Sequence, residues 1–129
     1  MKQAARFITF ASLVQVFGFL IALPGHLDEP SWSAHAQFHH VLGWLWLAGF
    51  NILILALTWG PLQRYDRWSF RLLVIAFLFA QVGFFATVLL VPEGRPDETW
   101  FYAALGLVAA INAGGLVAAW RALAGHAPA

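Results

Sequence analysis

The sequence contains no cysteine, which excludes disulfides, thiolate metal sites, iron–sulfur clusters and thiol redox chemistry. Charged residues are also scarce, at 10% of the chain against 61% hydrophobic residues, whereas an ordinary soluble domain is about one quarter charged. The net charge is only +1, so no basic field exists to gather nucleic acid, and we expect no nucleic-acid partner. This composition is typical of an integral membrane protein.

Four apolar segments lie along the chain, and none carries Asp or Glu in its central part. A proton or ion path through the middle of a membrane therefore has no obvious titrating relay. The third and fourth segments also lack histidine, which disfavours haem, because its two axial ligands would have to come from different helices. The sequence leaves the cofactor, if there is one, unknown.

The four segments nearly exhaust the chain, and proline- and glycine-containing connections separate them. Each is close to the ~20 residues that a helix needs to cross the hydrocarbon core, and each is apolar on every face, unlike the alternating strands of a barrel. We therefore predict an all-α protein, an integral membrane four-helix transmembrane bundle that forms a single domain over residues 1–129. The predicted spans are roughly Ala5–Leu23, Gln37–Trp59, Phe70–Val91 and Trp100–Ala122.

The first span could also be a signal peptide, since Lys2 and Arg6 precede its apolar core. The core is long, however, and Ala22-Leu23-Pro24 is a poor small-residue cleavage site. We expect this span to be retained.

The positions of the basic residues predict the orientation, because Lys and Arg in short loops are retained on the cytoplasmic side. Six of the seven lie at the N-terminus, in the middle connection and near the C-terminus: Lys2, Arg6, Arg64, Arg67, Arg71 and Arg121. We expect both termini to be cytoplasmic. Arg95 and five of the six carboxylates then lie on the outer side, namely Asp28, Glu29, Glu93, Asp97 and Glu98.

Each predicted span carries one carboxamide near its middle: Gln15, Asn51, Gln81 and Asn112. A buried amide in hydrocarbon is costly unless it is hydrogen-bonded. One hypothesis is that the four amides form a polar network on the bundle axis. The alternative is that some of them bond to carbonyls of their own helices.

The fourth span has a row of small residues at every fourth position: Gly106, Ala110, Gly114 and Ala118. Such a row lets a second helix approach closely. The row predicts either packing inside the bundle or a homodimer. Other partners that we expect are membrane lipid and a larger membrane complex.

The segment SAHAQFHH, Ser33–His40, brings three histidines to the outer end of the second span. His35 and His39 share one helical face, and His40 points about 140° away from His35. We expect His39 to matter most and His40 to be replaceable. A metal would need a third ligand, so the candidate metal set is His26, His35 and His39. Three roles of these histidines stay open: polar residues of the membrane interface with no specific function, metal ligands, or groups that handle protons or orient a ligand.

Trp44 and Trp46 lie one to two turns below these histidines. Because both are away from the membrane boundary that tryptophan prefers, at least one should face inward or line a cavity. The predicted ligand-binding set is therefore His35, His39, Trp44 and Trp46.

The layout and the stretch PSWSAHAQFH, residues 30–39, resemble the DoxX-like small four-helix membrane proteins of bacteria, some of which carry a Trp and then His-x-x-Phe-His at the start of the second span. The resemblance covers the whole chain in topology and about ten residues in motif. It implies the fold and a location in the bacterial inner (cytoplasmic) membrane, and it assigns no catalytic residue.

Two function classes follow. The first is a non-enzymatic bundle that binds an apolar or amphipathic ligand, such as a lipid or a quinone, or that serves as an accessory subunit of a membrane complex. The second is a metal- or proton-dependent membrane enzyme with its site at the outer mouth. Whether the protein is an enzyme is left open.

Overall fold

The computed structural model describes residues 1–90 and 99–126, and these residues form long α-helices and one short 3₁₀ helix. The elements are α1 (Lys2–Leu27), α2 (Ala34–Trp59), η1 (Pro61–Arg64), α3 (Arg67–Leu90) and α4 (Thr99–Ala124). No strand occurs in this part of the chain. All four α-helices are long and apolar enough to cross a membrane. The predicted all-α, four-helix membrane fold is confirmed.

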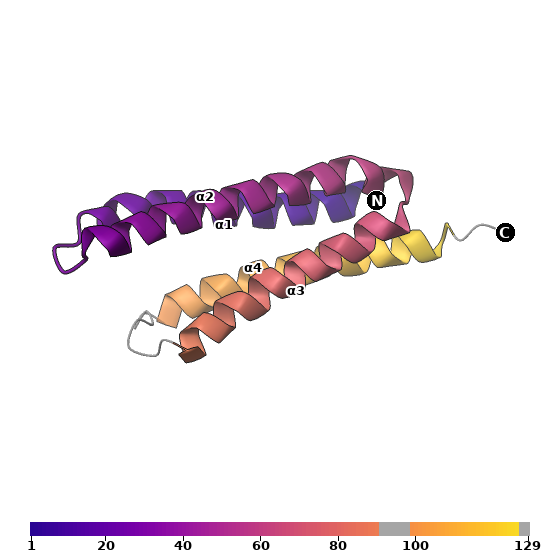
Figure 1. Ribbon diagram of the computed structural model, residues 1–129. Coiled ribbons are helices and arrows are strands. Elements are labelled where there is room, and N and C mark those ends of the chain that lie inside the picture. The colour runs from indigo at the N-terminus through magenta and orange to yellow at the C-terminus, as the bar shows by residue number, and fades with distance from the viewer. Residues whose placement is uncertain (91–98, 127–129) are drawn as a thin grey trace.

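Two helical hairpins, α1–α2 and α3–α4, make up the bundle (Figure 1). Both ends of the chain and η1 lie at one end of the bundle, which we call the termini end. The connection between α1 and α2 lies at the other end, the histidine end. The hairpins converge at the termini end and diverge toward the histidine end.

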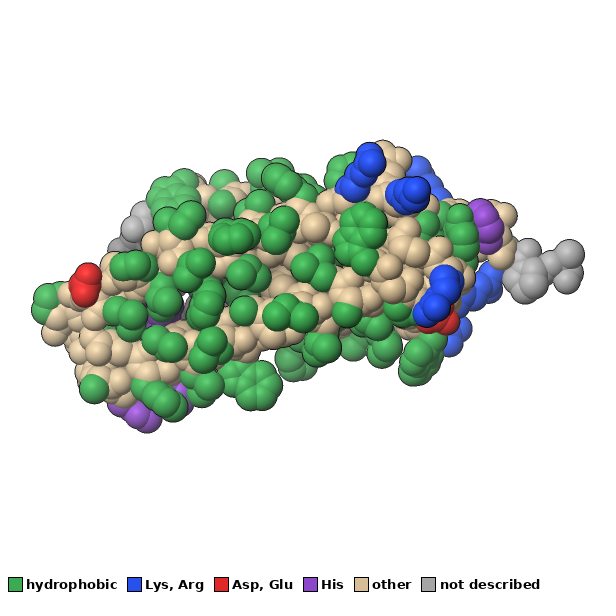
Figure 2. Space-filling view, turned by 90° about the horizontal axis from the view of Figure 1, so that it is seen from above, with side chains coloured by type: hydrophobic (Ala, Val, Ile, Leu, Met, Phe, Trp, Pro, Cys, Tyr) green, Lys and Arg blue, Asp and Glu red, His purple; other side chains and the backbone are tan. Residues whose placement is uncertain are grey.

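Charge is distributed unequally between these two ends. Figure 2 shows the Lys and Arg side chains gathered at the termini end, whereas a group of histidines lies at the opposite end. The predicted outer-side residues Glu93, Arg95, Asp97 and Glu98, and Val91 of the third span, lie outside the described residues.

The hairpins pack most closely where α1 contacts α4. The buried residues of these two helices are mostly small: Ala4, Ala5, Ile8, Ala11 and Ser12 on α1, with Val108, Gly115, Ala119 and Leu123 on α4. A Cβ placed on Gly115 would lie 2.8 Å from Cγ1 of Ile8 and 3.3 Å from the carbonyl oxygen of Ala4. Such close backbone approach is how membrane helices gain van der Waals contact.

Most of the predicted small-residue row is not this contact surface; the exception is Ala118, which is half-buried and packs against the core that includes Ala4 and Ala119. Gly106, Ala110 and Gly114 are exposed, and a Cβ on Gly106 or Gly114 would meet no atom within 4 Å. Packing instead uses Gly115 and Ala119, one position further along the helix. One residue corresponds to a rotation of about 100°, and α4 carries small residues on both faces, so spacing alone did not identify the packed one.

Side-chain hydrogen bonds join α2 to α1 along the first hairpin. Gln37 Nε2 donates to the Leu27 carbonyl at 2.8 Å, and Trp59 Nε1 donates to Thr9 Oγ1 at 2.8 Å. Between them, Trp44 Nε1 donates to the Val16 carbonyl at 3.5 Å. These bonds fix the rotation of α2 against α1 and so determine which α2 side chains face inward.

Candidate functional site

The inward side of α2 is a row of residues at alternating spacings of four and three: His40, Trp44, Leu47, Asn51, Ile54 and Thr58. Asn51 and Thr58 are buried, and the other four are half-buried. This spacing keeps one helical face directed at a neighbouring helix. Three members of the row, His40, Asn51 and Thr58, carry polar side chains.

The histidines divide between two sides of α2. The rings of His35 and His39 lie 4.4 Å apart on the exposed side. His40 turns inward, where its ring centroid lies 4.6 Å from that of His26 and 5.3 Å from that of Trp32. His26 also stacks on Trp32 at 5.3 Å with an interplanar angle of 17°. His26, Trp32 and His40 therefore form a second cluster, in which His26 is exposed and the other two residues are half-buried.

The metal set predicted from the sequence is not brought together, because His26 pairs with His40 and leaves His35 and His39 on the other side of the helix. Within residues 1–90 and 99–126, no group of three or more His, Asp or Glu side chains could hold a metal ion. Glu29, a nearby carboxylate, accepts hydrogen bonds from the Ser31 hydroxyl at 2.7 Å and from the Ser31 backbone N–H at 3.2 Å. These bonds lower the pKa of Glu29.

The predicted tryptophan pair is likewise divided. Trp44 is half-buried and bonds to α1, as the expectation of one inward tryptophan requires. Trp46 is 73% exposed and faces away from the bundle. The ligand-binding set His35, His39, Trp44 and Trp46 thus does not line a common surface.

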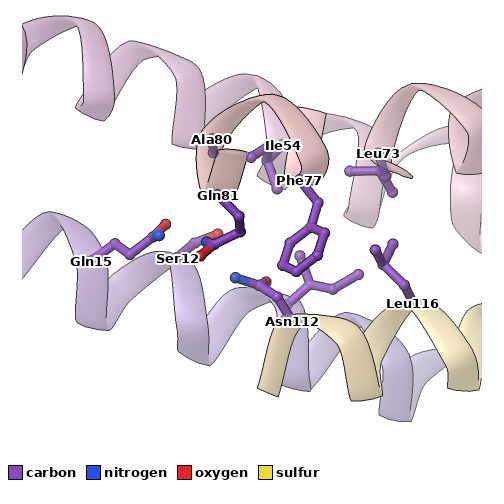
Figure 3. A pocket seen from close by; sticks show the side chains of 10 residues that line it. Ser12, Gln15, Ile54, Leu73, Phe77, Ala80, Gln81, Asn112 and Leu116 are labelled. Atoms are coloured by element: carbon purple, nitrogen blue, oxygen red, sulfur yellow. The ribbon is translucent and has the colours of Figure 1, made fainter. Parts of the chain in front are cut away.

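A different constellation occurs at mid-bundle, where three of the four mid-span carboxamides border one cavity. Its lining comes from all four α-helices: Ile8, Ser12, Gln15, Ile54, Leu73, Phe77, Ala80, Gln81, Asn112 and Leu116. Figure 3 shows Gln81 reaching from α3 toward Ser12 of α1, with the Asn112 amide on α4 directed into the same space. The cavity measures about 20 Å³, which is enough for about one water molecule or one ligand oxygen and too small for a ring.

The amides around this cavity have unused hydrogen-bonding capacity. Each carboxamide offers two donor hydrogens and one acceptor oxygen, yet those of Gln15, Gln81 and Asn112 have no hydrogen-bond partner among the described residues. In hydrocarbon an unpaired amide costs several kcal/mol. The cavity is therefore chemically suited to a polar guest.

Asn51, the fourth carboxamide, does not join this group. It is only 2% exposed, and its Nδ2 donates to the Leu47 carbonyl of its own helix at 2.9 Å. Its Oδ1 is buried without a partner, as are Thr58 Oγ1 and His40 Nε2 on the same row. Three of the four amides thus line one cavity without hydrogen bonds to one another, and Asn51 bonds within its own helix. The predicted network of four amides stays a prediction.

The cavity lies at the fork between the hairpins. On α1 the buried residues run from Ala4 to Ser12 and stop there, and beyond this point the hairpins diverge (Figure 1). Ile8, Leu73 and Leu116 border the cavity on its packed side. On α1 the polar cluster thus marks the place where the buried residues end, whereas on α4 Val108, one turn beyond Asn112, is still buried.

Ser12 and Phe77 are lining residues that sequence reasoning missed. Ser12 lies one turn before Gln15, so the two share a face of α1. This i, i+3 pair of polar residues within an apolar span was the available signal. Phe77 carried no signal, because it is one of 12 phenylalanines in the chain.

No protein-family model, curated protein or solved structure matches this chain. The resemblance to DoxX-like proteins therefore stays a prediction.

Proposed function

We propose that this multi-pass membrane protein binds an amphipathic membrane molecule, a lipid or a quinone, with the polar head at the fork between the hairpins. The observation that carries the proposal is the convergence on one mid-bundle cavity of Gln15, Gln81 and Asn112, none of which has a hydrogen-bond partner among the described residues. A carbonyl or hydroxyl oxygen of the ligand enters the cavity and accepts hydrogen bonds from the amides. Its apolar body stays outside the cavity.

The surroundings of the cavity support this arrangement. Phe77 and Leu116 supply apolar contacts beside the amides, and a few polar groups in an apolar wall are the usual composition of a ligand site. The cavity is too small for a whole ligand head, so a quinone ring lies at its mouth rather than inside. None of the described residues that line the cavity is charged, which favours a neutral head such as a carbonyl.

The test is the amount of small molecule that co-purifies with the protein. Lipids and quinones are extracted from detergent-purified parent, Gln81→Leu and Asn112→Leu and quantified by mass spectrometry. Loss of one hydrogen bond of about 1 kcal/mol in this setting corresponds to roughly fivefold weaker retention. Asn51→Leu is the matched control, because it removes a mid-span amide that does not line the cavity, and it should retain the ligand.

Equal ligand content in the parent, Gln81→Leu and Asn112→Leu would reject the proposal. So would an equal loss in Asn51→Leu, because the loss would then follow from removal of any buried amide. If the cavity holds only ordered water, the parent, Gln81→Leu and Asn112→Leu should have equal ligand content.

The proposal extends to location. We place the protein in a bacterial inner membrane with both termini cytoplasmic. The support is the position of six basic residues at the termini end: Lys2 and Arg6 at the start of α1, Arg64 in η1, Arg67 and Arg71 at the start of α3, and Arg121 near the end of α4. The histidine end is then the outer end. The alternative of an enzyme at the outer mouth has less support, because the four histidines of the histidine end form two separate pairs, His26 with His40 and His35 with His39.

A further inference from the structure

A second cavity lies at the termini end, between the start of α3 and the end of α4. It measures about 410 Å³, within the range of small-molecule sites. The lining residues are Arg67, Phe70 and Arg71 from α3, with Trp120, Leu123 and Ala124 from α4. We call this cavity the basic groove. It is separate from the fork, and the inference drawn from it does not depend on the proposed function.

Charge in the basic groove is of one sign. Arg67 and Arg71 are one helical turn apart, so their side chains share a face. No carboxylate lines the groove, and neither guanidinium has a salt-bridge partner in the part of the chain that the structure describes. Two unpaired guanidinium groups in one groove call for an anion, and the planar fork of arginine suits phosphate.

The nearest acidic residue is already engaged. Asp66 Oδ2 accepts hydrogen bonds from the backbone N–H of Ser69, at 2.7 Å, and from the Ser69 hydroxyl. Those bonds, the hydroxyl first, lower the pKa of Asp66. Asp66 therefore caps the N-terminus of α3, and this carboxylate does not line the groove.

The helix itself does not account for the two arginines. Arg67 is the first residue of α3, where the helix dipole disfavours positive charge, and Arg71 lies in the second turn. The rule that basic residues stay on the cytoplasmic side explains why Lys and Arg lie near the membrane. It does not explain why two arginines line one groove together with a tryptophan of another helix.

The rest of the lining matches a lipid better than a free ion. Phe70, Leu123, Ala124 and the ring of Trp120 provide an apolar wall next to the guanidinium groups. Trp120 is 59% exposed, and tryptophan prefers the headgroup layer of a membrane. A phosphate with a glycerol and acyl chains attached contacts both parts of the groove, whereas inorganic phosphate contacts only the charged part.

We infer that the basic groove binds the phosphate of an anionic phospholipid, with Arg67 and Arg71 on the phosphate and Trp120 against the glycerol and upper acyl region. Basic pockets between membrane helices are suited to acidic lipid headgroups. Binding there ties the start of α3 to the end of α4.

The experiment compares binding of the detergent-purified full chain to phosphatidylglycerol, phosphatidylcholine and inorganic phosphate, with thermal unfolding and lipid retention in native mass spectrometry as readouts. The variants are Arg67→Gln/Arg71→Gln and, as matched control, Arg6→Gln/Arg64→Gln, which removes two charges from the same end but outside the groove. Arg67→Lys/Arg71→Lys keeps the charge and removes the planar fork.

Phosphatidylglycerol should stabilise the parent and the Arg6→Gln/Arg64→Gln control, and phosphatidylcholine should not. At roughly fivefold per arginine near the surface, Arg67→Gln/Arg71→Gln should bind phosphatidylglycerol about 30-fold more weakly. Arg67→Lys/Arg71→Lys should bind phosphatidylglycerol more tightly than Arg67→Gln/Arg71→Gln and more weakly than the parent. Loss of two positive charges at a helix N-terminus does not weaken α3, so reduced lipid binding in a folded variant reports on the groove.

Three outcomes would overturn the inference. The first is equal stabilisation by phosphatidylcholine, which means unspecific lipid contact. The second is equal stabilisation by inorganic phosphate, which means an ion site. The third is an equal loss in the Arg6→Gln/Arg64→Gln control, which means general attraction by net charge.

Discussion

Gly115 of α4 lies directly against Ile8 of α1, so close that a Cβ on the glycine would come within 2.8 Å of Ile8 Cγ1. The same Cβ would be 3.3 Å from the Ala4 carbonyl oxygen, which is backbone and cannot rotate away. The contact between the two hairpins thus depends on the absence of one side chain.

Gly115→Val should separate α1 from α4 and destabilise the bundle by about 1 to 3 kcal/mol, the usual range for overpacking. Gly114→Val is the matched control, because a Cβ there meets no atom within 4 Å. Both variants change helix propensity equally, so their difference in unfolding free energy in detergent isolates the packing. Equal stability of the two would show that Gly115 is not the point of closest approach.

Asn51→Leu should be nearly neutral, within about 0.5 kcal/mol of the parent. The substitution removes a buried acceptor without a partner, Oδ1, and a bond to the helix's own Leu47 carbonyl. Removing an unsatisfied buried group of similar shape costs little. Chemical denaturation measures this, and a loss of 2 kcal/mol or more would indicate that Asn51 holds the helices together.

His40→Ala should destabilise the histidine end more than His39→Ala. His40 packs with His26 and Trp32 between α1 and α2, whereas His39 is exposed and contacts His35. This order is the reverse of the one that the helical-face argument predicts from the sequence. Hydrogen exchange of the α1–α2 connection would measure it, and faster exchange in His39→Ala than in His40→Ala would contradict it.

Ser69→Ala should raise the pKa of Asp66 toward its ordinary value, because the Ser69 hydroxyl bond is the first cause of its lowering. A carboxyl with a lowered folded-state pKa stabilises the fold above its unfolded-state pKa, and this stabilisation is lost as the pH falls through the folded-state pKa. Ser69→Ala should thus be less stable than the parent at neutral pH, with a smaller difference in acid. NMR titration of Asp66 follows this directly, with Ser31→Ala as an unaffected control at the other end.

A reporter that works only in the cytoplasm should be active when it is fused after Ala129, and a reporter that works only outside the cytoplasm should be inactive there. The reason is that the basic residues gather at the termini end. A fusion within the α1–α2 connection, after Pro30, should give the opposite result. Agreement of both fusions with the reverse orientation would place the basic groove in the outer leaflet and the histidines inside.

Hydrophobic runs predicted the number of helices and their centres, but not their ends. The predicted second span begins at Gln37 and α2 begins at Ala34, after Ser33, whose Oγ accepts from the Ala36 N–H at 3.2 Å. The third helix likewise starts at Arg67, because Asp66 caps it. Capping residues start helices in the polar layer, outside the apolar run. Both caps could have been identified from the sequence, because Ser33 and Asp66 are typical capping residues that precede an apolar segment.

Rotation about the helix axis was the part that the sequence could not define. It decides that His40 faces inward, that Trp46 faces outward, and that Gly115 rather than Gly114 meets α1. In a membrane almost every face of these helices is apolar, so the contrast between a core face and a solvent face that defines rotation in soluble proteins is missing. The carboxamides were the one informative pattern, and even they did not separate Asn51 from the other three.

The hydrogen bonds from Gln37, Trp44 and Trp59 to α1 also bear on the order in which the chain assembles. All of their partners lie within the first 59 residues, so the first hairpin can close during synthesis, as soon as both of its helices have entered the bilayer. The contact between Ile8 and Gly115 joins residues more than 100 positions apart and must form later. The small-residue face of α1 is therefore exposed to lipid until α4 has inserted. A defect in the insertion of α4 should leave an intact first hairpin without its packing partner, which membrane quality-control proteases can degrade.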